Sequence, residues 1–150
     1  VRLRANSRAF SWLVSHAAFV HNRYQVKASG LTPYEDVHQC PYKESLFHFG
    51  QPVLLRRPTA TMQAKLEQRW VAGLWMGRRS LTGEHNVAIS PNMILCGRSA
   101  RPLGRDSAEW PRVQELWQEW AHEVEEGHVR AQREKEPEME KRPRPSDLVD

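Results

Sequence analysis

Residues 69–79, with the sequence Arg-Trp-Val-Ala-Gly-Leu-Trp-Met-Gly-Arg-Arg, decide the fold that we expect for this chain. Apolar side chains alternate here with a period of two, which is typical of a long β-strand. Gly73 and Gly77 indicate a bend or bulge of the kind that small barrels use at their corners. The same alternation places Trp70 and Trp75 on opposite faces, so at most one of them belongs in a hydrophobic core.

Shorter alternating segments lie on both sides of this stretch and are separated by turn-forming residues. Residues 53–56, 85–89 and 93–96 have the strand pattern, and Pro58, Gly83 and Pro91 lie between them. Four or five short strands, about ten residues apart, are typical of a small sandwich or barrel. We therefore expect a small antiparallel β-barrel over residues 49–105.

Helices are expected on both sides of this region, which makes the fold class α+β. Over residues 5–28 apolar side chains recur at helical steps, and the stripe consists of Phe10, Leu13, Ala17, Val20 and Tyr24, with Trp12 and Phe19 beside it. So wide an apolar arc favours packing on more than one side. Within residues 106–130 an amphipathic helix is expected at 108–126. Residues 131–150 contain little that could be buried, so we expect a disordered charged tail.

The charge of the chain is unevenly distributed. Of its 150 residues, those from 1 to 107 include 15 Lys and Arg against 6 Asp and Glu, whereas residues 108–150 include 7 against 12. A basic body favours a polyanionic partner. No apolar run approaches the roughly 18 residues of a membrane span, so we expect no membrane association and an intracellular protein, nuclear or cytoplasmic. Cys40 and Cys96 are expected to stay reduced.

Metal and acid–base chemistry have weak support in the sequence. The candidate zinc ligands are not spaced as two close pairs, and they are His16, His21, His38, Cys40 and His48. Glu35 and Asp36 are adjacent in a connector, where helix capping or solvation explains them, and two-metal chemistry needs several acidic groups that converge. We therefore predict no metal site, no catalytic residue and no cofactor in this chain.

Basic and aromatic residues on or beside the expected strands are the most informative set. Lys and Arg provide the salt-dependent phosphate contacts of nucleic-acid binding, and exposed Trp can stack on bases. The alternative is that one Trp fills the core while the arginines are only solvated at its rim. The predicted nucleic-acid-binding residues are Arg56, Arg57, Lys65, Arg69, Trp75, Arg78, Arg79, Arg98 and Arg101.

Residues 10–34 also contain a recognisable series of motifs, namely Phe10-Ser11-Trp12, Ala17-Ala18-Phe19-Val20-His21-Asn22-Arg23 and Gly30-Leu31-Thr32-Pro33-Tyr34-Glu35. This series resembles the end of the integrase catalytic core in the Pol polyprotein of long-terminal-repeat retrotransposons. The segments that follow are similar to the Copia-like continuation, and they are Phe49-Gly50, Lys65-Leu66-Glu67-Gln68-Arg69 and Gly73-Leu74-Trp75-Met76-Gly77. The resemblance covers roughly residues 8–103 and depends on the order and spacing of these motifs. Arg78 departs from it, because the family has an aromatic residue there.

The resemblance implies a function and a domain organisation. Residues 1–48 would be the end of a ribonuclease-H-like catalytic core with its connector, and residues 49–105 an SH3-like barrel that binds DNA. The family's catalytic carboxylates lie upstream of the Trp-containing helix, so this fragment would not be an enzyme, although its parent would be a Mg²⁺-dependent DNA strand transferase. DNA and other integrase subunits are the implied partners. Two alternatives stay open: a protein–protein interaction module that uses the helix at 108–126, and a decayed transposon remnant without function.

The purified chain is therefore expected to show no nuclease or strand-transfer activity with Mg²⁺ or Mn²⁺, because its carboxylates do not converge. Incubation with labelled DNA in the presence of each metal measures this. Metal-dependent cleavage that co-purifies with the chain, and that disappears when Glu35 or Asp36 is substituted, would contradict the prediction.

Overall fold

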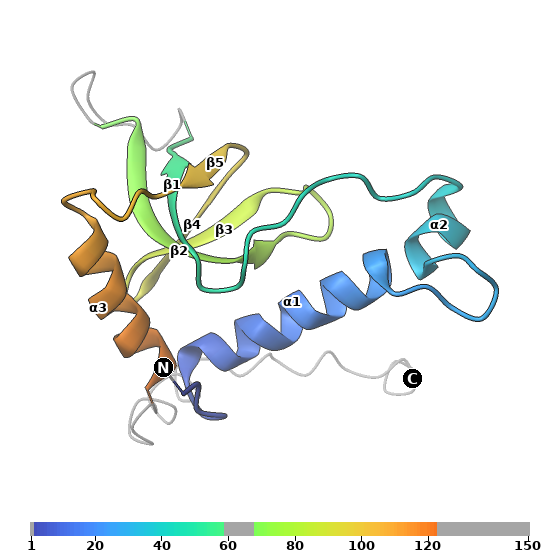
Figure 1. Cartoon of the computed structure of the whole chain (residues 1–150), viewed down its shortest axis with the longest axis horizontal. Helices are drawn as coiled ribbons and strands as arrows, with labels where there is room; N and C mark the ends of the chain where they lie inside the picture. Colours follow the sequence, from blue (N-terminus) through green and yellow to red (C-terminus); the bar gives the residue numbers. More distant parts are fainter. Residues whose placement is uncertain (1, 59–67, 123–150) are drawn as a thin grey trace, which may run out of the picture.

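The computed structural model describes residues 2–58 and 68–122. These ranges form, in chain order, α1 (Arg8–Tyr24), α2 (Pro33–His38), β1 (Pro52–Arg56), β2 (Trp70–Arg78), β3 (His85–Ser90), β4 (Met93–Gly97), β5 (Ala100–Pro102) and α3 (Trp110–Ala121). Helices α1 and α3 converge near the N-terminus, and the sheet lies in the angle between them (Figure 1). The expected α+β class is confirmed. Lys65 and the expected tail at 131–150 lie outside the described residues, and none of the helices in the described ranges is long and apolar enough to cross a membrane.

The strands form one antiparallel sheet in the order β4-β3-β2-β1-β5. β5 pairs with β1, where Arg101 lies opposite Leu54, and β4 pairs with β3, where Leu95 lies opposite Val87. The strands were expected to close into a barrel, and this expectation is wrong, because β4 and β5 remain as two edges of an open sheet. Arg98 and Ser99 connect β4 at one edge of the sheet to β5 at the other edge. The chain does not reverse direction between them, so β4 and β5 do not pair as a hairpin.

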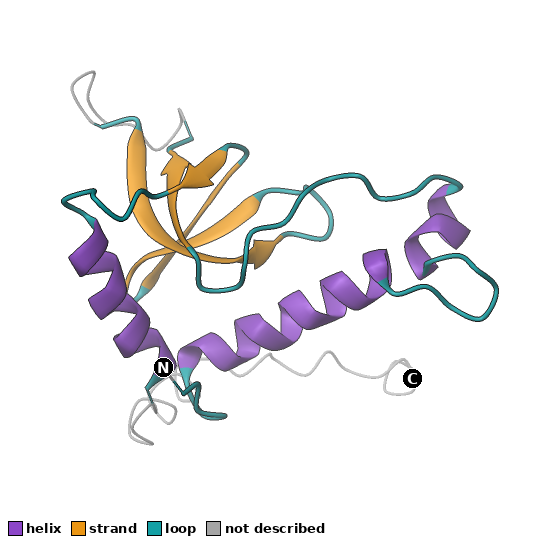
Figure 2. Cartoon of the chain, viewed as in Figure 1, coloured by secondary structure: helices purple, strands orange, loops and turns teal. Residues whose placement is uncertain are grey.

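Strand β2 is the central strand and is buried on both faces. Ala72, Leu74 and Met76 belong to a cluster with the helices, whereas Trp75 belongs to a second cluster with residues of β1 and β3. Figure 2 shows the helices α1 and α3 bordering the sheet, with α2 beyond the far end of α1. The predicted alternation in β2 is thus confirmed, and so is the bulge at Gly77, where the pairing with β3 shifts and φ is 111°.

Helix α1 is shorter than expected and presents a different face to the core. Ala9 and Phe19 are buried and Trp12 packs against the helix-side cluster, whereas Phe10 is 39% and Tyr24 is 40% exposed. The predicted stripe is therefore wrong, being rotated by about one residue. The packed face also includes polar residues that a stripe of apolar residues leaves out, because the His16 ring lies against Phe49 and Trp75 and the Arg23 guanidinium lies over Phe19.

Helix α2 gives the Thr-Pro-Tyr-Glu motif a structural role. The Thr32 hydroxyl accepts a hydrogen bond from the Glu35 N–H at 3.1 Å, and the Glu35 carboxylate accepts one from the Thr32 N–H at 2.7 Å. This reciprocal arrangement is a capping box. The guanidinium of Arg23 lies 3.8 Å from the ring centroid of Phe19 and also faces Tyr34, which joins α1 to α2.

Helix α3 begins two residues later than the predicted 108–126, and residues 123–126 of that prediction lie outside the described residues. Side chains that reach the backbone hold α3 to the sheet. Arg112 donates to the carbonyl oxygens of Ala72 at 2.8 Å and Ile89 at 3.2 Å. The indole N–H of Trp120 donates to the Ser90 carbonyl at 3.1 Å. These bonds satisfy backbone acceptors where α3 crosses the sheet, so α3 is part of the folded unit.

Substituting Gly73 by Ala is expected to lower the free energy of unfolding by about 1–3 kcal/mol, because overpacking forces backbone shifts. An added Cβ would lie 2.4 Å from the Ala88 carbonyl oxygen and 2.7 Å from a methyl carbon of Val87, and the backbone atom cannot rotate away. Urea unfolding of the two proteins measures the difference. An unchanged midpoint would mean that β2 and β3 do not approach each other this closely.

Candidate nucleic-acid interface

Five of the predicted binding residues gather around the end of β1, and we call them the arginine cluster: Arg56, Arg57, Arg69, Arg98 and Arg101. The Arg56 N–H donates to the Ser99 carbonyl at 2.9 Å, and the Arg57 N–H donates to the Arg69 carbonyl at 2.8 Å. These bonds, with the pairing of β5 on β1, bring three separate segments together. All members are exposed except Arg57, which is half-buried.

A cavity of about 480 Å³ opens at the cluster, and its lining includes Arg56, Arg57, Arg98 and Ser99. The Nε of Arg57 is buried without a hydrogen-bond partner. Within residues 2–58 and 68–122, no carboxylate forms an ion pair with a member of the cluster. Glu84 also lines the cavity, but it pairs with Arg79 at 3.8 Å. The cluster can therefore offer charged donors to phosphate oxygens.

Trp70 adds an aromatic surface to the cluster. It lies directly opposite Arg56 in the pairing of β1 with β2, and the Arg101 guanidinium lies 4.4 Å from its ring centroid. Such stacking holds a guanidinium in place while leaving its edges open to hydrogen-bond acceptors. The predicted set included Trp75 and omitted Trp70. The signal that favoured Trp70 was its position at the strand end, beside Arg69.

Trp75 is fully buried in the sheet. Its indole N–H donates to the Nδ1 of His85 at 3.0 Å, and Phe47 packs edge-on against its ring. Phe47 belongs to residues 39–51 between α2 and β1, which we call the connector. A buried indole cannot stack on a base, which corrects the predicted role of Trp75 and makes it a core residue. The connector at residues 46–47 covers the face on which Trp75 lies.

Arg78 and Arg79 are engaged with carboxylates, unlike the arginine cluster. The Arg78 side chain is only 11% exposed, forms an ion pair with Glu44, and donates to the Gly83 carbonyl at 2.9 Å. Arg78 thus links Glu44 of the connector to Gly83 in the turn before β3. Arg79 is more exposed but has Glu84 as its partner. A polyanion would have to displace these carboxylates, so Arg78 in particular is better explained as a structural residue.

Comparisons with known proteins identify no relative of this chain, so its function must be inferred from the chemistry of the site. A scan against models of protein families and searches among curated proteins and solved structures find no match to this chain. In the part of the chain that the structure describes, no group of three His, Cys, Asp or Glu side chains could hold a metal ion, and Cys40 and Cys96 are free thiols. The functional inference therefore rests on the arginine cluster.

The protein is expected to lose stability as the pH falls from 6.5 towards 4, because burial, reinforced by the charge of Arg78, lowers the pKa of His85 to about 4. Below pH 6.5 the His85 imidazole is protonated in the unfolded chain but stays neutral in the folded protein. The free energy of unfolding therefore falls by about 3 kcal/mol between pH 6.5 and 4. Urea unfolding between pH 7.5 and 4 measures the loss.

The control is His85→Gln, whose amide can still accept from the Trp75 indole but does not titrate. In this variant the fall in stability should be clearly smaller. The imidazole signals of the wild-type protein give a second readout that does not depend on whether the variant folds. A His85 that titrates near 6.5 would contradict the prediction.

Proposed function

We propose that this chain is a non-catalytic fragment of a Copia-like long-terminal-repeat retrotransposon integrase that binds DNA through its arginine cluster in support of DNA integration. The missing part of the parent polyprotein would perform Mg²⁺-dependent strand transfer. Other integrase subunits are further partners in this proposal, and the place of action is intracellular, nuclear or cytoplasmic.

The observation that carries the proposal is the accumulation of five arginines around one strand end, where no described carboxylate pairs with them. Arg and Lys contacts to phosphates dominate affinity for DNA and carry no sequence information. A surface of this chemistry is suited to hold a duplex in place rather than to read its bases. This is the role expected of an accessory module beside a catalytic core.

The shape of the sheet supports the finer assignment of an SH3-like module. Its five strands are short, and Arg56 at the end of β1 lines the same cavity as Gly97 at the end of β4. The sheet thus curls until two non-neighbouring strands meet, as in a barrel that is incompletely closed. The cavity with its arginines lies where they meet.

The outer face of α1 supports the placement of residues 1–48 at the end of a larger core. Phe10 and Val14 are exposed apolar residues on this helix, and a surface helix normally has a polar outer face. In the proposed parent protein this face would pack against the preceding part of the catalytic core.

A protein-interaction module is the second candidate function. It is favoured by a groove on α3 that is lined by Trp110 and Trp117. Binding that does not respond to salt would support this candidate over DNA binding.

Binding to duplex DNA is expected to be weak, largely independent of sequence and steeply dependent on salt. Each phosphate that is neutralised releases about 0.9 of a counterion, so four engaged arginines give a log–log salt slope of about −3 to −4. Substituting Arg56 and Arg98 together by Gln should flatten the slope by about two units. Fluorescence anisotropy with two unrelated duplexes, titrated over several salt concentrations, measures both effects.

A matched control removes the same charge elsewhere. Arg2 and Arg105 are exposed, and Arg105 follows Leu103, whose N–H donates to the Pro52 carbonyl at the other end of β1. Substituting this pair by Gln should leave the slope nearly unchanged. If the two double substitutions changed the slope equally, the net charge of the chain alone would determine binding, which would contradict the proposed interface.

A further inference from the structure

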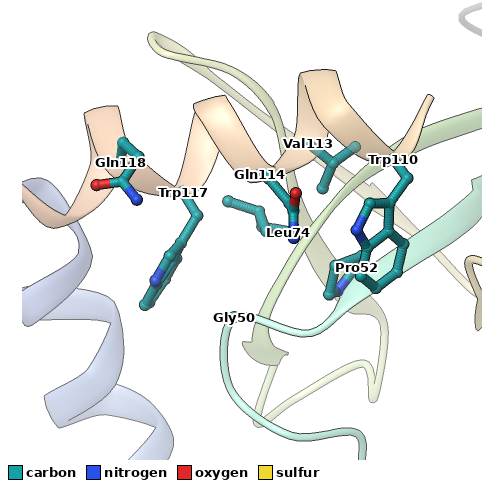
Figure 3. Close-up of a pocket in the computed structure, with 8 residues that line it drawn as sticks. All are labelled: Gly50, Pro52, Leu74, Trp110, Val113, Gln114, Trp117 and Gln118. Atoms are coloured by element: carbon teal, nitrogen blue, oxygen red, sulfur yellow. The ribbon is translucent and has the colours of Figure 1, made fainter. Parts of the chain in front are cut away.

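A second cavity lies between α3 and the sheet and is separate from the arginine cluster. Its volume is about 370 Å³, and its lining includes Trp110, Gln114, Trp117 and Gln118 of α3 with Gly50 and Pro52 of the segment that enters β1. Figure 3 shows the two Trp side chains projecting from one side of α3, with Gln114 between them. We call this cavity the tryptophan groove.

The helical geometry of α3 sets the spacing of the two Trp side chains in the groove. Trp110 and Trp117 are seven residues apart, which is about 10 Å along the axis, and both lie on the same side of the helix. Gly50 brings the backbone directly under the second ring, since a Cβ there would lie 2.9 Å from Trp117. Neither indole N–H donates a hydrogen bond within the described residues. Two half-buried rings with available donors therefore face the groove.

This chemistry is suited to an extended segment that contains proline. Polyproline II segments dock in grooves lined by aromatic side chains, and their backbone carbonyls have no internal partners. The indole N–H groups and the amides of Gln114 and Gln118 can donate to such carbonyls.

The chain itself contains a segment of this kind at residues 141–145, Lys-Arg-Pro-Arg-Pro. We propose that this segment, in the same molecule, occupies the tryptophan groove. Five residues of polyproline II span about 12 Å between the first and the last, and the eight helical steps from Trp110 to Gln118 also span about 12 Å. The two lengths match.

Reach favours the segment of the same molecule. Lys141 follows Ala121, the last residue of α3, by 20 positions. A 20-residue tether typically bridges about 25 Å and gives an effective concentration of the order of millimolar. This inference does not depend on the proposed DNA binding.

Indole signals in ¹H–¹⁵N spectra of the full chain test the proposal. The double substitution Pro143→Ala and Pro145→Ala should shift the signals of Trp110 and Trp117 and leave those of Trp70 and Trp75 in place. Trp110→Phe and Trp117→Phe assign the two signals. The control is Pro137→Ala, which changes a proline outside the segment and should shift neither.

Two further measurements decide between occupants. A synthetic peptide of residues 140–146, added to the doubly substituted chain, should move both signals back towards their wild-type positions. Dilution of the wild-type chain by tenfold should not move them. If the double substitution moves neither signal, the groove does not hold this segment, and if dilution moves them, the occupant comes from a second copy and the intramolecular proposal fails.

Discussion

The burial of strand β2 on both of its faces is the constraint on which the other features depend. Its even-numbered residues meet α1 and α3, and Trp75 on the opposite face fills the space under the connector. Because both faces are apolar, the helices and the connector must cover the sheet together. The hydrogen bond from Trp75 to His85 satisfies the polar atom that this arrangement would otherwise leave buried and unpaired. α1, α3 and the sheet therefore form one folded unit.

The same constraint sorts the arginines into two groups. Arg78 follows the buried part of β2 and points inward, where its guanidinium pairs with Glu44 and donates to the Gly83 carbonyl, although its Nε has no hydrogen-bond partner among the described residues. The arginine cluster forms where β1 ends and the chain crosses from β4 to β5, and four of its five side chains are exposed in the described part of the chain. Arg78 thus has a structural role, whereas the arginine cluster is available to bind a polyanion. The two groups look alike in the sequence.

Local patterns predicted the strands, the helices and most of the cluster, because alternation and helical periodicity are encoded in neighbouring residues. They could not decide between Trp70 and Trp75, since a strand buried on both faces gives no polar side as a reference. They also misplaced the α1 stripe, because a count of apolar residues omits His16 and Arg23, whose side chains pack on aromatic rings of the folded chain. The open sheet and the Arg78–Glu44 pair depend on contacts between residues far apart in the chain, and no local pattern contains that information.

The most direct test of DNA binding at the arginine cluster is a residue-resolved map of DNA contact. Titration of the ¹⁵N-labelled chain with a short duplex, observed at the arginine Nε–H and tryptophan indole signals, reports each side chain separately. The account predicts that Arg56, Arg57, Arg98, Arg101 and Trp70 shift together in a salt-dependent manner, while Arg78 and Trp75 stay in place. Shifts confined to the exposed face of α1 or to the tryptophan groove, or none at all, would contradict it.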